Sequence, residues 1–296
     1  MMFEIGEIVT RKSHGDDIVF KVTGISTNNS GEKQYELKGL HMRLLADAPE
    51  SDLIKVTAEF LKDEIVRLEG TFNDSMRRVL QRRGYQREQS EMARGEPAKK
   101  FQFFDWPGKV LHIDGDEDYM KMCLKTYGQL HIEAIGEWIE ESKQPERVAE
   151  LVRKYQPDIL ILTGHDSLVS LGKKEKDKER DFRDMNNYRN SQYFVNSVHN
   201  ARSVRPSVDD LVIFAGACQS YFEAILAAGA NFASSPTRIF IHAYDPVFIA
   251  EKVAFTPINR VVDISDAITA SVTGADGVGG LETHGKFRLG MPKSPY

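Results

Sequence analysis

The chain contains two long apolar runs that each end in small and polar residues, DILILTGH at residues 158–165 and DLVIFAGAC at residues 210–218. Short, continuous runs of large aliphatic side chains are typical of strands buried on both faces of a parallel sheet. Two further runs have this character, VLHI at residues 110–113 and a weaker run at residues 131–135. Together they predict the core strands of one parallel sheet.

Segments with helical spacing of apolar residues separate these runs, at residues 118–127, 144–155 and 187–202. Strands that alternate with helices form a parallel sheet covered by helices on both faces. We therefore expect an α/β domain over residues 101–296.

The first part of the chain has a different pattern. Residues 1–55 contain short alternating runs separated by turn-forming stretches, which predicts a small antiparallel β-barrel of SH3-like size. Residues 56–100 form a charged helical connector, because residues 71–100 hold eight Lys or Arg and four Asp or Glu. We expect this connector to be a mobile linker or an exposed helix.

Composition excludes several classes of protein. The 296 residues are 41% hydrophobic, with 39 Lys and Arg against 44 Asp and Glu, a net charge of −5. No run reaches the roughly 18 apolar residues of a membrane span, and the acidic balance argues against nucleic acid as a partner. The chain starts without a signal peptide's apolar stretch, so we expect a cytoplasmic protein.

Polar residues follow three of the predicted strands. Asp114 and Asp116 follow the first, His165 and Asp166 the third, and Gly216 and Cys218 the fourth. Because parallel strands end at the same edge of a sheet, these residues should meet there. No glycine-rich nucleotide-binding motif follows any strand, and GVGG at residues 277–280 is expected to form a flexible turn.

One histidine and one cysteine end neighbouring strands and suggest nucleophilic catalysis. An imidazole close to a thiol can remove its proton, so His165 and Cys218 predict a cysteine hydrolase. Two alternatives stay open. Residues 216–220, GACQS, approximate the elbow of amidases and amidotransferases, in which a later histidine, His242 or His284, would be the base. The chain could also be a non-enzymatic scaffold. Cys123, the second cysteine, lies in an apolar helical stretch and is expected to pack in the core.

The His and Ala-Cys endings resemble those of the caspase-type cysteine peptidases, which include gingipains, clostripain, legumain and separase. The chain resembles more closely the YabG family of sporulation proteases, through FEIGEIV at residues 3–9, LTGHDS at residues 162–167, residues 214–222 and residues 227–260. The resemblance implies a caspase-like, mostly parallel sheet flanked by helices. It also implies an endopeptidase that cuts spore coat and cortex-associated proteins after arginine, with Cys218 as the nucleophile and His165 as the base.

The resemblance has further implications for location, cofactors and specificity. The enzyme would act in the mother cell and later join the spore coat, with no metal or organic cofactor, although calcium serves some relatives. Arginine specificity needs a carboxylate, which clostripain-like relatives often place two residues before the cysteine, where this chain has Gly216. The candidates are therefore Asp114, Asp116 and Asp166. In the caspase-type enzymes a glycine usually follows the histidine, and its backbone N–H donates to the oxyanion. This chain has Asp166 in that position.

Overall fold

The computed structural model describes residues 3–27, 31–94, 102–169 and 180–294. Within these ranges, a six-stranded sheet has the order β12-β11-β10-β9-β7-β8. Its strands are β7 (Val110–Asp114), β8 (Ala134–Trp138), β9 (Ile159–Thr163), β10 (Val212–Ala215), β11 (Phe232–Ser234) and β12 (Val278–Gly280). The first five are parallel and β12 pairs antiparallel with β11. The predicted mixed α/β fold with a mostly parallel sheet is confirmed.

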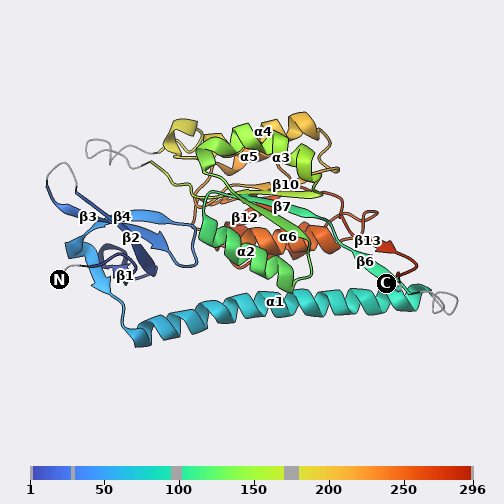
Figure 1. Cartoon of the computed structure of the whole chain (residues 1–296), viewed down its shortest axis with the longest axis horizontal. Coiled ribbons are helices and arrows are strands. Elements are labelled where there is room, and N and C mark those ends of the chain that lie inside the picture. The colour runs from blue at the N-terminus through green and yellow to red at the C-terminus, as the bar shows by residue number, and fades with distance from the viewer. Residues whose placement is uncertain (1–2, 28–30, 95–101, 170–179, 295–296) are drawn as a thin grey trace.

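Helices cover both faces of this sheet (Figure 1). One face carries α2 (Glu117–Gln129), α6 (Asp245–Phe255) and α7 (Ile264–Ala270), and the other carries α3 (Gln144–Tyr155), α4 (Ser191–Val204) and α5 (Phe222–Ala227). Successive residues of β9 alternate between the two cores: Ile159 and Ile161 belong to the first, and Leu160 and Leu162 to the second. All four side chains are buried, which explains why the strand is apolar throughout.

The strand order reverses direction between β7 and β9. The chain goes from β7 outward to β8, and then crosses back to β9 on the other side of β7 before continuing to β10 and β11. At such a switch point the loops after the two strands diverge and leave a crevice at their carboxyl ends, where ligands of open α/β sheets bind. Asp114 is the last residue of β7, and Asp116 and His165 follow β7 and β9 directly, so all three lie at this switch point.

The amino-terminal strands form an antiparallel sheet in the order β4-β3-β2-β1-β5. They are β1 (Ile8–Arg11), β2 (Phe20–Thr27), β3 (Lys33–Gly39), β4 (Leu45–Pro49) and β5 (Leu53–Lys55), with 3-10 turns η1 (Lys12–His14) and η2 (Glu50–Asp52). A separate core that includes Val9, Val22 and Tyr35 fills one side of the sheet. The small antiparallel unit is present, whereas its closure into an SH3-like barrel stays a prediction, as do the three domain boundaries.

The charged connector is one long helix, α1 (Ala58–Arg94), which runs beneath the α/β domain (Figure 1). Its arginine pair is partly buried against this domain: Arg82 forms an ion pair with Glu251, and Arg83 donates to the carbonyl of Leu130 at 2.9 Å. The guanidinium of Arg83 also lies 3.4 Å from the centre of the Phe255 ring. The connector is therefore helical over residues 58–94, and these contacts hold it against the α/β domain.

The expectation of a flexible turn at residues 277–280 was wrong, because Val278–Gly280 is the edge strand β12. A Cβ atom on Gly279 would lie 2.8 Å from the ring of Phe222, and one on Gly280 would lie 2.3 Å from the ring of Phe232. The glycines therefore serve close packing of the strand against aromatic side chains.

The remaining described elements are the strand pair β6 (Phe104–Trp106) and β13 (Arg288–Gly290), and the 3-10 turns η4 (Glu141–Lys143), η5 (Met185–Asn187) and η6 (Gly274–Asp276). No helix in the described ranges has a stretch long and apolar enough to cross a membrane.

Candidate active site

His165 and Cys218 occupy equivalent positions on neighbouring strands. In the register of β9 and β10, Leu162 pairs with Ala215, and His165 and Cys218 each lie three positions further on (165 − 162 = 3 and 218 − 215 = 3). The N–H of Gly216 still bonds the carbonyl of Leu162, at 3.0 Å, so the two loops leave the sheet together. The histidine and the cysteine are thus at the same edge, next to the switch point.

Glu141 holds His165 from one side. Its carboxylate accepts the backbone N–H of His165 at 2.6 Å and lies 3.4 Å from ring atom Nδ1. Burial alone would raise the pKa of Glu141, but the bonds from the side chain and backbone of His165 bring the pKa below its ordinary value. Glu141 is therefore ionised at neutral pH and can orient the imidazole.

The position of Glu141 requires two glycines at the ends of β7 and β9. A Cβ atom on Gly115 would lie 2.1 Å from the Glu141 carboxylate, and one on Gly164 would lie 2.2 Å from it. The sequence analysis missed Glu141, which lies in the short turn η4. Along the chain this residue is far from both Gly115 and Gly164, although it is close to them in space. The only signal was the pair of glycines, which indicates that some group approaches the backbone closely at both strand ends.

The other ring nitrogen of His165 has no hydrogen-bond partner within the described chain. Nε2 is buried and lies 3.5 Å from the carboxylate of Asp116, and the ring packs near Tyr119, with 5.8 Å between ring centres. An unpartnered, buried imidazole nitrogen is costly unless a ligand or reacting group uses it.

Cys218 is fully buried, and its sulfur contacts the peptide of Ile241. The N–H of Ile241 donates to Sγ at 3.2 Å, and the thiol lies 3.8 Å from the Ile241 carbonyl oxygen. Burial raises the pKa of the thiol to about 12, although the hydrogen bond from the Ile241 N–H acts to lower it. Among the described residues no hydrogen bond joins Sγ to the ring of His165. The thiol is therefore protonated at neutral pH and forms no hydrogen bond with the imidazole.

Asp114 lies at the centre of a buried polar network. It accepts from Nη1 of Arg43 at 2.7 Å and from the hydroxyl of Thr163 at 2.9 Å, and it lies 3.2 Å from Nε2 of His112. Burial would raise the pKa of Asp114, but the charge of Arg43 and the bond to His112 hold it well below its usual range. Asp114 thus already binds a guanidinium, one that comes from the amino-terminal sheet.

Asp116 and Asp166 have different surroundings. Asp116 caps α2 by accepting from the N–H of Asp118 at 2.9 Å, and it pairs with Lys38 at 2.7 Å. Asp166 is 3% exposed and accepts hydrogen bonds from four groups, the hydroxyls of Ser191 and Ser220 and the N–H groups of Ser167 and Asn190. Its oxygens are therefore occupied in holding the loop after β9, and burial raises its pKa.

Gly216 has a backbone conformation that favours glycine. Its φ is +110°, and a Cβ atom there would lie 2.5 Å from the hydroxyl oxygen of Ser234. A side chain would be strained and would displace the chain two residues before Cys218.

Family comparison gives this geometry a context. The family described as YabG peptidase U57 matches residues 4–292. The chain is 41% identical over 293 residues to the sporulation-specific protease YabG of Bacillus subtilis (strain 168), and the match covers 99% of each chain. The chain belongs to the YabG peptidase family. The comparison with solved structures gave no match.

Membership of the YabG family confirms the resemblance and makes the chain a peptide hydrolase, homologous to a sporulation protease, with protein substrates. The non-enzymatic scaffold is thereby set aside.

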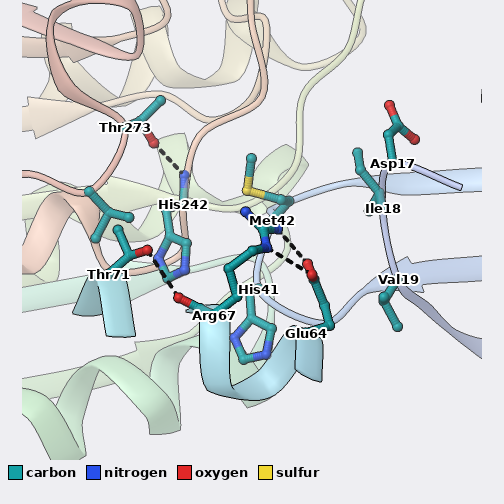
Figure 2. A pocket seen from close by; sticks show the side chains of 11 residues that line it. Asp17, Ile18, Val19, His41, Met42, Glu64, Arg67, Thr71, His242 and Thr273 are labelled. Carbon is teal, nitrogen blue, oxygen red and sulfur yellow. Dashed lines mark hydrogen bonds and ion pairs between the residues drawn. The ribbon is translucent and has the colours of Figure 1, made fainter. Parts of the chain in front are cut away.

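Two cavities of this YabG-family chain lie away from the strand-end pair. One, of about 260 Å³, is lined by residues that include His41, Met42 and His242 (Figure 2), and the other, of about 1160 Å³, lies between α1 and α6. Neither is lined by Cys218 or His165. The described residues contain no group of three or more His, Cys, Asp or Glu that could hold a metal ion.

Proposed function

We propose that this chain is a cysteine endopeptidase that cuts spore coat and cortex-associated proteins after arginine, with Cys218 as nucleophile and His165 as base. The observation that carries the proposal is the shared register of these two residues at the switch-point edge of the sheet. The mother cell, and later the spore coat, is the proposed place of action.

In the proposed reaction, Nε2 of His165 takes the thiol proton as Sγ of Cys218 attacks the carbonyl carbon of the arginyl bond. The protonated imidazole then gives that proton to the leaving amine, and an acyl enzyme remains. Water attacks the acyl carbon as His165 accepts its proton, the C–Sγ bond breaks, and the imidazole returns the proton to the leaving sulfur, which restores the thiol and the free base. Glu141 is a positioning residue, since its carboxylate fixes Nδ1 and leaves Nε2 available to the thiol.

Two backbone N–H groups can hold the developing oxyanion, those of Cys218 and Asp166. Neither donates a hydrogen bond to another described residue. Every residue except proline carries this donor, so aspartate in the place of the usual glycine removes no hydrogen bond to the oxyanion.

Asp114 is the proposed acid of the arginine subsite, because its carboxylate already holds a guanidinium at 2.7 Å. Asp116 is engaged by Lys38 and Asp166 by the loop after β9, so both have less capacity for a substrate.

The elbow alternative has less support. Residues Cys218 and Phe222, where α5 begins, are separated by a turn, and the positive φ of 56° is at Gln219 rather than at the cysteine. His284 donates its N–H to Asp209, which precedes β10, so it lies toward the opposite edge of the sheet.

The test compares the wild type with Cys218→Ala and His165→Ala on an arginine-containing coat protein, with cleavage sites read by mass spectrometry. Both variants should lose at least about 10³-fold in kcat, and wild-type cuts should follow arginine. The exposed His284→Ala is the matched control and should retain activity. Full activity without the imidazole of His165 would instead support the elbow.

A further inference from the structure

The turn between β3 and β4 enters the edge of the α/β domain that carries Cys218. Arg43, in this turn, is fully buried although it belongs to the amino-terminal sheet. Burial of an arginine destabilises a protein unless its charge is paired, and turns that connect strands rarely contain a buried arginine. The contacts of residues 41–43, called here the 41–43 segment, explain its burial.

The backbone of the 41–43 segment pairs with residues 241–243 through an isolated antiparallel β-bridge, the shortest form of strand pairing. Met42 is opposite His242, the N–H of Arg43 donates to the carbonyl of Ile241 at 3.4 Å, and the N–H of Ala243 donates to the carbonyl of His41 at 2.9 Å. Extended peptides are recognised by this kind of strand addition, with the backbone giving affinity and alternate side chains giving specificity.

This pairing brings Arg43 next to the nucleophile. Ile241 contacts both groups, since its carbonyl accepts the Arg43 N–H and its own N–H donates to Sγ of Cys218 at 3.2 Å. The Arg43 side chain then enters the acidic pocket, where Nη1 bonds Asp114 at 2.7 Å and Nη2 bonds the Ala243 carbonyl at 3.3 Å. The ring of Tyr119 lies over the guanidinium, 5.1 Å from ring centre to Cζ.

The chain turns back directly after Arg43. The N–H of Leu44 donates to the carbonyl of Met42 at 2.7 Å, and the N–H of Gly39 donates to the carbonyl of Leu44 at 2.9 Å. The segment is therefore extended only up to Arg43 and fills only the part of the site before the scissile bond. Lys38 fastens the turn from its other end through Asp116, at 2.7 Å, and Asp118, at 2.8 Å.

We propose that the 41–43 segment is a built-in inhibitor that occupies the substrate strand site, with Arg43 in the subsite for the arginine of a protein substrate. The inference rests on the proposed function. An arginyl substrate must displace the segment before it can reach Cys218. The cavity in Figure 2 lies beside the segment and is lined by His41, Met42 and His242, which places open space next to the turn that must move.

Competition of this kind changes KM and leaves kcat unaltered. If only a fraction f of molecules has an open site, the apparent KM is the intrinsic value divided by f. A tethered segment competes at an effective concentration in the millimolar range. A variant whose segment cannot occupy the subsite should therefore have a KM at least about tenfold lower, with kcat within about twofold of the wild type.

The experiment uses the full-length chain and a fluorogenic arginyl peptide. Arg43→Ala removes the side chain from the pocket. Gly39→Ala keeps Arg43 but places a Cβ atom 2.5 Å from the Met42 carbonyl oxygen, so the turn must shift. Both variants should lower KM. The control is Arg11→Ala, which breaks an ion pair with Asp52 (2.9 Å) in the same sheet and should leave KM unchanged.

A second readout needs no catalysis, namely the rate at which iodoacetamide alkylates Cys218, followed by peptide mass mapping. The wild-type thiol should react at least about 100-fold more slowly than a free cysteine peptide, and faster in either variant. Equal KM in all chains, or a wild-type Cys218 as reactive as the free peptide, would overturn the proposal. Faster alkylation with no Cys218-dependent hydrolysis in any chain would instead refute the proposed function.

Discussion

The substitution Glu141→Gln tests whether the Glu141 carboxylate orients the imidazole of His165, because it changes the partner of the ring and leaves His165 itself in place. The amide oxygen of glutamine can still accept the His165 backbone N–H, which the carboxylate accepts at 2.6 Å, so the loop after β9 should be retained. What is lost is the negative charge 3.4 Å from Nδ1. That charge matters most when the imidazole becomes protonated, which in the proposed mechanism happens during the chemical step and not during substrate binding.

The size of the effect follows from the distance. At an effective dielectric constant of about 20, two unit charges 3.4 Å apart attract by about 5 kcal/mol, an upper bound because both side chains retain some contact with water. Hydrogen bonds to charged groups contribute about 1.5–3 kcal/mol in mutational series. Because 1.36 kcal/mol is tenfold in rate, kcat should fall about 10- to 150-fold, with KM within about twofold.

Steady-state kinetics on an arginyl peptide at pH 7.5, with the melting temperature as a folding check, measure this. The matched control is Glu140→Gln, because the neighbouring Glu140 pairs with Lys143 at the surface, with 62% of its side chain exposed. The control should keep wild-type kcat. If Glu141→Gln also kept wild-type kcat, or changed KM alone, Glu141 would have no role in orienting the base.

Three further predictions concern specificity and stability. Asp114→Asn should reduce kcat/KM for arginyl peptides relative to leucyl peptides. Because it leaves Arg43 unpaired, it should also lower the free energy of unfolding by about 3–5 kcal/mol. Unchanged selectivity would exclude Asp114 from the arginine subsite. Burial lowers the pKa of His242 to about 3, so the unfolded chain binds the proton first and stability falls below about pH 6.5. Urea unfolding at pH 7 and pH 5 should show about 2 kcal/mol of this loss in the wild type and none of it in His242→Gln, and equal losses would contradict the assignment. Gly216→Ala should lower the free energy of unfolding by about 2 kcal/mol or more, seen as a lower melting temperature. Gly84→Ala in α1, where the added Cβ meets open space, should not destabilise the protein.

The strands and most helices followed from local pattern. The runs that became β7, β9 and β10 are buried at every position and mostly apolar because helices cover both faces of the sheet, and the helix expected at residues 144–155 is α3. The weaker run was placed a few residues early, since β8 is at the edge and its residues are only partly buried. Pattern could not reveal β12, where glycines serve packing against Phe222 and Phe232.

Part of the candidate site could be predicted from the sequence. The strand endings at His165 and Cys218 could be recognised because a parallel sheet brings the ends of adjacent strands together by its register. Asp114, one of three acids considered for the arginine subsite, could be placed at this edge for the same reason. Glu141 was not, because its position depends on the packing of η4 against two strand ends.

The sequence by itself determined the alternation of strands and helices, and with it the edge at which polar residues gather, because burial on both faces imposes a local apolar pattern. Only the tertiary structure decided what stands at that edge. The approach of Glu141 to His165 and the entry of Arg43 into the pocket of Asp114 join residues 24 and 71 positions apart. Contacts of this kind leave no periodic pattern in the chain, since they depend on how separate elements pack rather than on the repeat of any one of them.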